Sequence, residues 1–307
     1  MKECPKKCKS QSLNHKLINC FSRNLNKFII SQNKTFDLTG YKYTSNKFPE
    51  EFDKFRIVHL SDIHNRLQGY LADDVIKIIT RNRPDIIIIT GDYYDAHEMI
   101  YDNSFALMKR LADICPVYYV SGNHEELTPD IRDEFFEGVK KSGVRFLDNE
   151  TETITRNGKS ISLIGVRDYM SYAESREVID RAFEKLLDFP DEEKMLNGFT
   201  DMLGKLTSEA ECDFKILLSH RPELFEEYVN ENINLVFSGH AHGGQFRIPF
   251  IGGLFAPNQG TFPKYAEGCH EKNNTVLIIS RGIGNSSFPL RLNNHPEIIV
   301  TEFEYKN

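Results

Sequence analysis

No stretch of this 307-residue chain holds the roughly 18 consecutive apolar residues that a membrane-spanning helix needs. The basic N-terminus also lacks the apolar segment of a secretory signal peptide. Cysteine is sparse: of six, three fall in the first 20 residues and the others are scattered. Cys4 and Cys8 have a zinc-like spacing, but no second close pair follows. We therefore expect free thiols and a cytoplasmic protein.

The chain also lacks an excess of positive charge. Lysine and arginine number 38 against 45 aspartates and glutamates, which gives a formal charge of −7. General nucleic-acid binding is not expected, because proteins of that class present a basic surface. An acidic protein can still take an anionic substrate where bound metal ions reverse the local field.

Residues 1–35 differ from the rest in charge. Eight lysines and arginines stand there against a single acid, Glu3. Apolar residues recur at spacings of three and four, namely Leu13, Leu17, Ile18, Phe21, Leu25, Phe28 and Ile29. This pattern predicts a basic amphipathic helix, which can make peripheral contact with an anionic membrane. The alternative is an N-terminal extension that frays or docks on the core.

Residues 36–307 are predicted to form the folded body, in which strands and helices alternate. Apolar runs predict strands at 55–60, 85–90, 116–120, 144–147, 152–156, 160–166, 214–218, 235–237, 245–248, 276–280 and 298–303. Periodic apolar positions predict helices at 69–80, 104–114 and 129–141, and residues 168–213 read as a helical excursion. We expect an α/β fold, a four-layer α/β/β/α sandwich in which two mixed sheets pack face to face with helices outside.

Six short polar motifs stand out, and the first five each come at or just after a predicted strand. They read Asp62-Ile63-His64, Gly91-Asp92, Gly122-Asn123-His124-Glu125, Ser219-His220, Gly239-His240 and Ala241-His242. Each motif alone is a weak signal, since a Gly-Asp pair after a strand is also an ordinary turn. Together they bring carboxylate, imidazole and amide groups to one edge of a sheet. Such a cluster can hold two divalent cations and split a phosphate ester.

The ordered set D-x-H, G-D, G-N-H-E, H and G-H-x-H resembles the calcineurin-like metallophosphoesterases over roughly residues 55–302. The segments LLSHRPE, SGHAHGGQ and SRGIGNSSFPLRLNNHPE are similar to the YkuE-like bacterial branch, which includes relatives of UDP-2,3-diacylglucosamine pyrophosphatases. Members of that branch commonly carry an N-terminal membrane anchor or export signal. This chain departs from them there and offers only the basic stretch, so membrane association is an expectation beside the cytoplasmic location.

The resemblance implies a binuclear metal centre. One ion would be held by Asp62, His64 and His242, the other by Asn123, His220 and His240, with Asp92 bridging the two. Imidazole, carboxylate and carbonyl ligands without thiolate suit two divalent ions such as Mn, Fe or Zn, and leave the identity open.

The chemistry expected of such a centre is hydrolysis. Two ions can share a water and lower its pKa, so that the hydroxide formed attacks phosphorus. His124, which is adjacent to a ligand, would protonate the leaving oxygen or hydrogen-bond the transition state. Asp95 or Glu125 would orient an imidazole, unless these carboxylates simply lie at the surface.

Arginines offer further candidates for contact with substrate. Arg281 and Asn285 sit in a glycine-rich turn after a predicted strand, where Arg281 either grips a phosphate or closes a surface ion pair. Arg66, Arg167 and Arg221 are weaker candidates for the same role.

Residues 246–265 crowd aromatic and aliphatic side chains between glycines and prolines. They either form an apolar wall for a lipid or aromatic substrate portion or pack against their own domain. The predicted function is a binuclear-metal phosphodiesterase or pyrophosphatase acting on a small-molecule or lipid-linked phosphoester. The alternatives are a phosphomonoesterase, acting on phosphoproteins or small molecules, and a non-catalytic metal-binding scaffold.

Overall fold

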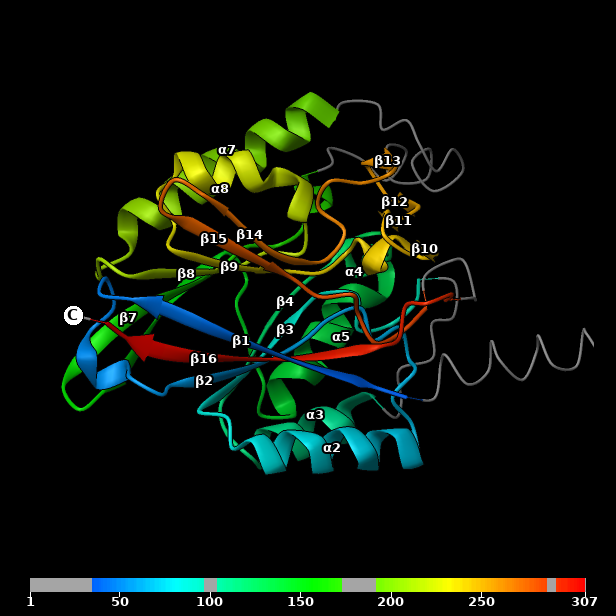
Figure 1. Cartoon of the computed structure of the whole chain (residues 1–307), viewed down its shortest axis with the longest axis horizontal. Helices are drawn as coiled ribbons and strands as arrows, with labels where there is room; N and C mark the ends of the chain where they lie inside the picture. Colours follow the sequence, from blue (N-terminus) through cyan, green and yellow to red (C-terminus); the bar gives the residue numbers. More distant parts are fainter. Residues whose placement is uncertain (1–34, 97–103, 173–191, 286–290, 307) are drawn as a thin grey trace, which may run out of the picture.

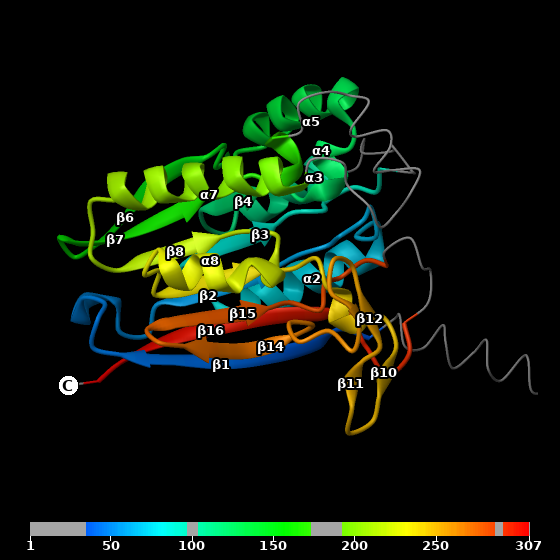
Figure 2. The ribbon, with the colours of Figure 1, turned by 90° about the horizontal axis from the view of Figure 1, so that it is seen from above.

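Two six-stranded sheets lie face to face in the computed structural model, and helices cover the outer face of each (Figures 1 and 2). The structure describes residues 35–96, 104–172, 192–285 and 291–306. Both sheets mix parallel and antiparallel strands. This arrangement confirms the predicted α/β/β/α sandwich.

The first sheet has the order β1-β16-β2-β3-β4-β5. Its strands are β1 (Asp37–Ser45), β16 (Glu297–Tyr305), β2 (Arg56–Leu60), β3 (Ile86–Thr90), β4 (Val117–Val120) and β5 (Arg145–Phe146). Strands β2 to β5 are parallel, whereas β16 runs antiparallel to β2 and parallel to β1. The central strand β3, with the sequence IIIIT, is buried along its whole length, as a parallel strand covered on both faces must be.

The second sheet has the order β14-β15-β9-β8-β7-β6. Its strands are β14 (Gly268–Lys272), β15 (Thr275–Ile279), β9 (Leu235–Ser238), β8 (Lys215–Leu218), β7 (Lys159–Gly165) and β6 (Glu150–Arg156). The four inner strands are parallel, and β14 and β6 are antiparallel edge strands. Two short ribbons follow β9: β10 (Arg247–Ile248) with β11 (Gly252–Gly253), and β12 (Phe255–Ala256) with β13 (Gly260–Thr261).

Helices lie on both outer faces (Figure 1). The first sheet is covered by α2 (Tyr70–Asn82), α3 (Ser104–Ala112) and α5 (Pro129–Lys141), and the second by α7 (Glu192–Glu209) and α8 (Phe225–Asn230). Helix α2 buries Ala72, Val75 and Ile79, the three-and-four spacing that turns one helix face to a core. The shorter helical turns are α4 (Asn123–Glu126), η1 (Glu50–Phe52), η2 (Tyr169–Tyr172), η3 (Pro222–Leu224) and η4 (His242–Gly244).

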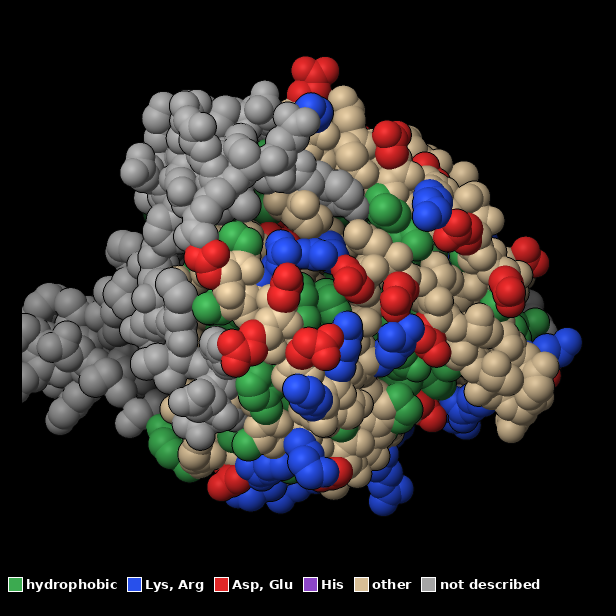
Figure 3. Space-filling model, turned by 180° about the vertical axis from the view of Figure 1, so that it is seen from behind, with side chains coloured by type: hydrophobic (Ala, Val, Ile, Leu, Met, Phe, Trp, Pro, Cys, Tyr) green, Lys and Arg blue, Asp and Glu red, His purple; other side chains and the backbone are tan. Residues whose placement is uncertain are grey.

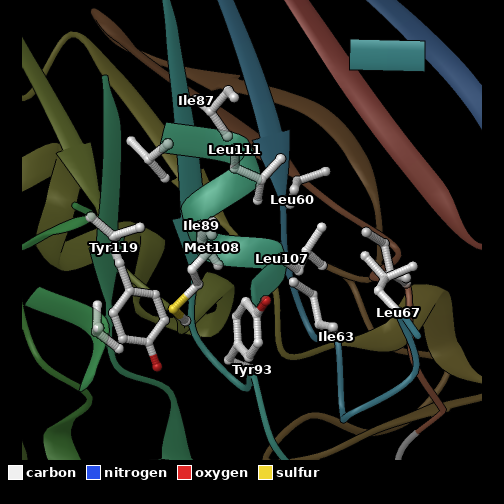
Figure 4. Close-up of a cluster of buried hydrophobic side chains, with 14 of the residues drawn as sticks. Leu60, Ile63, Leu67, Ile87, Ile89, Tyr93, Leu107, Met108, Leu111 and Tyr119 are labelled. Atoms are coloured by element: carbon white, nitrogen blue, oxygen red, sulfur yellow. The ribbon is translucent and has the colours of Figure 1, made fainter. Parts of the chain in front are cut away.

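Three hydrophobic clusters fill the spaces between the layers. Ile87 and Ile89 of β3 join the cluster under α3 (Figure 4), whereas Ile86 and Ile88 point to the other face and pack between the two sheets. This is the period-two alternation of a strand. A third cluster fills the space between the second sheet and α7 and α8. Each fully buried aliphatic side chain contributes about 1.5–3 kcal/mol to stability.

Several elements of the body were not predicted from the sequence: the strands β1 and β14, the helix α8, the short turn α4 and the ribbon strands β11, β12 and β13. The predicted strand at 245–248 shortens to β10, because Gln245 has a φ of 59° and belongs to the turn after η4. Within 168–213 the structure has η2 and α7, and residues 173–191 lie outside the described residues.

The predicted amphipathic helix within residues 1–35 also falls outside the described part of the chain, apart from Thr35. Among the residues that are described, no helix combines the length and the apolar composition needed to cross a bilayer.

The face seen from behind carries acidic and basic side chains interspersed (Figure 3). The expectation that the protein is not a general nucleic-acid binder stays a prediction.

Candidate metal centre

The motif residues meet at the carboxyl ends of strands from both sheets. Asp62, Asp92 and Asn123 follow β2, β3 and β4 of the first sheet. His220 and His240 follow β8 and β9 of the second sheet. Parallel strands end at one edge, and these two edges meet, because His220 Nδ1 lies 2.6 Å from the carbonyl oxygen at the end of β3.

Two motif glycines permit this close approach. A Cβ atom at Gly239 would lie 1.9 Å from Ser61 Oγ and 2.3 Å from Asp62 Oδ2. A Cβ atom at Gly122 would lie 2.2 Å from Asp92 Oδ1. Both glycines therefore let the backbone of one strand end touch a carboxylate that follows another strand.

The backbone is strained where the predicted ligands sit. The φ angle is 50° at Asp62, 45° at His64, 52° at Asp92, 65° at His240 and 46° at His242. Asp and His occupy this left-handed region more readily than most residues do. Strain of this kind costs about 1–3 kcal/mol per residue and is concentrated at functional sites.

The first group of polar atoms comprises Asp62, His64, Asp92 and His242, all buried, with one ligand atom from each within 4.8 Å of the others. His242 Nε2 lies 3.3 Å from His64 Nε2 and 3.3 Å from Asp62 Oδ1. His64 Nε2 lies 3.7 Å from Asp92 Oδ2. These separations suit a single cation bound between the four side chains.

The second group comprises Asp92, His220 and His240, again within 4.8 Å. His220 Nε2 lies 3.2 Å from Asp92 Oδ2 and 3.2 Å from His240 Nδ1. Asp92 therefore belongs to both groups and presents the same oxygen atom to each. Asn123 Oδ1 is buried and has no hydrogen-bond partner among the described residues, as expected of an amide oxygen meant for a cation.

The pKa values in the site reflect this crowding of buried groups. Burial raises the pKa of Asp62 to about 6 and lowers that of His64 to about 3. Burial also disfavours charge on His220, but the neighbouring Asp92 carboxylate outweighs it and raises the pKa of His220 to about 10. The Asp92–His220 pair is therefore ionised when the site holds no metal, and a bound cation would displace the His220 proton.

His124 lies at the rim of both groups. Its Nδ1 accepts the backbone N–H of Ala96 at 3.0 Å and lies 3.5 Å from Asp95 Oδ1, while its Nε2 lies 4.0 Å from Asp92 Oδ2. Burial disfavours charge on this ring, but Asp92 and Asp95 outweigh it and raise its pKa.

Glu125 has a different role. Its Oε2 accepts the backbone N–H groups of Asp92 at 3.0 Å and Gly122 at 2.7 Å, and its Oε1 accepts that of Tyr93 at 2.7 Å. The carboxylate thus ties the loops after β3 and β4 together. Of the two acids predicted to orient an imidazole, Asp95 is the one beside His124.

Arg281 and Asn285, the two residues of the turn that was predicted to contact substrate, have different surroundings. Arg281 Nη2 lies 2.9 Å from Asp37 Oδ2 and 3.1 Å from Glu297 Oε1, so the guanidinium is held by carboxylates of the first sheet. This favours the ion-pair alternative for Arg281. Asn285 follows Gly284, where a Cβ atom would lie 2.7 Å from His64 Cβ, and so belongs to the loop beside the first group.

The other arginines also have protein partners. Arg66 Nη1 donates to the Ile283 carbonyl at 2.8 Å, and Arg167 pairs with Glu126 at 2.7 Å. Arg221 is fully buried and pairs with Asp168 through Nε at 2.5 Å and through Nη2 at 3.0 Å.

Two residues near the site were not among the predicted site residues, although Arg291 lies in the segment SRGIGNSSFPLRLNNHPE. Arg291 is fully buried, and its Nη2 lies 3.2 Å from His242 Nδ1. Asn258, from the turn between β12 and β13, places its Oδ1 3.2 Å from His240 Nε2 and 2.7 Å from Arg221 Nη1. Asn258 Oδ1 can accept the N–H of the far nitrogen of His240, which is how outer groups fix the ring of a metal ligand, whereas the Arg291 guanidinium beside His242 can only donate.

The pattern of the calcineurin-like phosphoesterase family matches residues 55–244. Metallophosphoesterase YkuE of Bacillus subtilis is 29% identical over 276 residues, covering 88% of this chain and 86% of the relative. Phosphodiesterase YaeI of Escherichia coli is 25% identical over 259 residues, covering 83% and 84%. YpbG of Bacillus subtilis is 30% identical over 254 residues, covering 80% of each.

These matches agree with the site. The family pattern spans every motif from Asp62 to His242, and the site gathers buried histidines and aspartates in metal-ligand geometry. The chain belongs to the calcineurin-like phosphoesterase family, and it is a hydrolase of phosphoester bonds that binds divalent metal.

Proposed function

We propose that the chain hydrolyses phosphodiesters or pyrophosphates with two divalent ions bridged by Asp92. Asp62, His64 and His242 would hold one ion, and Asn123, His220 and His240 the other. The observation that carries the proposal is that Asp92 Oδ2 faces both groups, 3.7 Å from His64 Nε2 and 3.2 Å from His220 Nε2. Two ions sharing one carboxylate form the clamp used for in-line displacement at phosphorus, and Mn, Fe and Zn all suit these ligands.

Bound divalent ions supply Lewis acidity and lower the pKa of a coordinated water. The protein's own contribution is to hold the site dry and its ligands fixed. Gly239 and Glu125 bring the loops together, and the strained backbone keeps Asp62 and His240 in place. Fixed groups need no rearrangement as charge develops on the phosphoryl oxygens.

His124 is the proposed proton donor. Because its Nδ1 accepts the N–H of Ala96, the neutral ring carries its proton on Nε2, the nitrogen nearer Asp92. The raised pKa supports a donor near neutral pH. From this position the Nε2–H group of the neutral ring would hydrogen-bond a phosphoryl oxygen, and the imidazolium, with its Nδ1–H towards Asp95, would protonate the leaving oxygen. Asp95, beside Nδ1, would act as the positioning residue.

The experiment measures metal content and rate on one preparation. His124→Ala should retain the metal content of the wild-type protein and lose about 10²–10⁴-fold in hydrolysis of bis-p-nitrophenyl phosphate. His270→Ala, at a histidine of edge strand β14, is the matched control and should leave both unchanged. An unchanged rate in His124→Ala would reject the assignment. A metal content near one ion per chain in active enzyme would reject the bridged pair.

We propose further that the substrate carries a lipid or other apolar portion. The support is that the ribbon β12–β13, which brings Asn258 to His240, also exposes Phe255 and Phe262. The rate of hydrolysis should therefore differ between diesters with short and long acyl chains, and it should be higher for the long-chain compound. Equal rates on both would contradict the apolar portion and leave the metal chemistry untouched. The phosphomonoesterase alternative predicts instead that p-nitrophenyl phosphate is the faster substrate.

A further inference from the structure

The exposed apolar side chains of the described residues gather at one end of the molecule. The large ones are Leu38, Tyr70, Ile248, Phe250, Ile251, Phe255 and Phe262. Strand β1 runs parallel to β16, and β16 runs antiparallel to β2. Leu38, near the start of β1, therefore lies at the end of the sheet where β2 leads into Asp62. Helix α2 begins with Tyr70 at the same end, and the two ribbons follow His242 (Figure 1). Single exposed apolar residues are ordinary, but a group beside one site is not.

The ribbon β10–β11 carries the most exposed of these side chains at its tip. The exposed fraction is 109% for Phe250 and 64% for Ile251, and Ile248 is 38% exposed. Phe250 has a φ of 68°, a rare backbone conformation for a bulky residue. The ribbon projects beyond the body of the protein (Figure 2). The fold therefore holds an aromatic ring in solvent at a cost in backbone strain.

The base of this ribbon is fixed to the metal centre. Arg247 Nη1 donates to the Gly243 carbonyl at 3.3 Å, one residue after His242, and the Arg247 guanidinium also pairs with Glu267. The backbone N–H of Leu254 donates to the Gly244 carbonyl at 3.1 Å. A ligand-bearing turn thus continues directly into the apolar tip.

The segment of the two ribbons differs in charge from the whole chain, and Arg247 in it is paired with Glu267 directly after it. Between Gln245 and Ala266 the sequence has Arg247 and Lys264 and no acid, in a chain of net charge −7. Residues 1–34, which lie outside the described residues, add eight cations and one acid to the sequence before β1. Apolar and cationic groups presented together are the two signals that bind a protein to an anionic bilayer.

We propose that the tip of β10–β11, formed by Ile248, Phe250 and Ile251, inserts into the surface of an anionic lipid bilayer and holds the metal centre against it. The tip offers three large apolar side chains, whereas a stable protein partner covers about 800 Å² on each side. A bilayer accepts so small a contact, because lipids close around it. The docking does not depend on hydrolysis, but its use in presenting a membrane-borne phosphoester rests on the proposed function.

The chain contains no tryptophan, so one introduced residue reports on its own surroundings. Full-length Phe250→Trp is titrated with vesicles of phosphatidylcholine containing phosphatidylserine, with and without brominated acyl chains. Its emission should shift to the blue and be quenched by the bromine. Lys159→Trp, exposed at the start of β7 and so at the opposite end, is the control and should not respond. No response from Trp at position 250 would overturn the proposal.

A second variant tests the energetic role of the tip. Phe250→Ser/Ile251→Ser should bind the same vesicles at least about tenfold less in cosedimentation, because most of the apolar contact is lost. Its hydrolysis of bis-p-nitrophenyl phosphate without vesicles should equal that of wild type, which separates docking from catalysis. Unchanged vesicle binding would overturn the proposal. A second result would also overturn the proposal. If the emission of Phe250→Trp shifted to the blue with rising protein concentration and without vesicles, the tip would bind a second copy of the chain.

Discussion

His59 shows what burial does to an imidazole that is not among the proposed metal ligands. It is fully buried in β2, where its Nε2 lies 2.8 Å from Thr90 Oγ1 and its ring packs against Phe237. Burial lowers the pKa of His59 from 6.5 to about 3. The folded protein therefore keeps this ring neutral, while the unfolded chain takes up a proton below pH 6.5. Its contribution to stability is complete above pH 6.5 and is lost as the pH falls towards 3.

This linkage predicts a specific effect of His59→Gln, which keeps a polar partner for Thr90 but cannot titrate. The stability advantage of wild type over the variant should shrink by up to roughly 1.4 kcal/mol per pH unit below 6.5. Urea unfolding at pH 7.5, 6 and 5, with chelator present so that metal does not contribute, measures it. The other histidines are common to both proteins and cancel in the difference. Parallel stability curves would show that His59 does not titrate on unfolding.

The sequence could predict those site residues that directly follow a buried strand, and not those that lie in irregular segments. Asp62, Asp92 and His220 follow buried strands directly, so a strand pattern and a polar motif together locate them at one edge. Arg291 and Asn258 approach the site from 49 and 18 residues away along the chain, through irregular segments. No periodicity links them to their imidazoles, so only the folded structure brings them to the site.

The ends of β9 and β2 touch through Gly239, and this contact gives a prediction about the loops. In Gly239→Ala the added Cβ would fall 2.3 Å from Asp62 Oδ2, so Asp62 must move. We expect metal affinity and the rate of hydrolysis to fall at least about 100-fold, as happens when a reacting group shifts by an ångström. Unfolding free energy should fall by about 1–3 kcal/mol from overpacking.

The control for this change is Gly40→Ala in β1, where an added Cβ meets no described atom within 4 Å. It removes the same kind of residue far from the metal centre and should leave metal affinity and rate unchanged. Titration calorimetry with Mn²⁺ on both variants measures the difference. If Gly239→Ala bound metal as wild type does, the contact between the two strand ends would not be needed to position Asp62.

The elements that were missed are those with a weak local pattern. Strand β1 pairs with β16, which lies 260 residues further along the chain, and it is half exposed, so neither a buried run nor a nearby partner marks it. Strand β14, with the sequence GCHEK, is a polar edge strand that exists because β15 pairs with it. Buried strands such as β3 are read easily because burial on both faces requires an unbroken apolar sequence.

The metal centre also joins the two halves of the whole fold. Asp62, His64 and Asp92 come from loops of the first sheet, and His220, His240 and His242 from loops of the second. Metal held between them would connect the sheets at one end, in addition to the hydrophobic cluster that packs between them. When the ions are removed, buried carboxylates and imidazoles lie beside one another without the cation that favours their burial. The unfolding free energy of the whole domain should therefore be lower in the metal-free protein.

Removal of metal should therefore lower the unfolding temperature of the whole domain in one transition. At a free metal concentration one hundred times the Kd, binding adds about 2.7 kcal/mol to the stability of the folded state. For a domain of this size that corresponds to roughly 5–10 °C. Calorimetry with EDTA, and again after Mn²⁺ is restored, measures the shift. His220→Ala/His240→Ala/His242→Ala, which removes every imidazole that the second sheet offers to the two groups, should lose most of the response, whereas His270→Ala should keep it. A metal-dependent shift that survived in the triple variant would mean that the ions bind on the first sheet only and do not join the two.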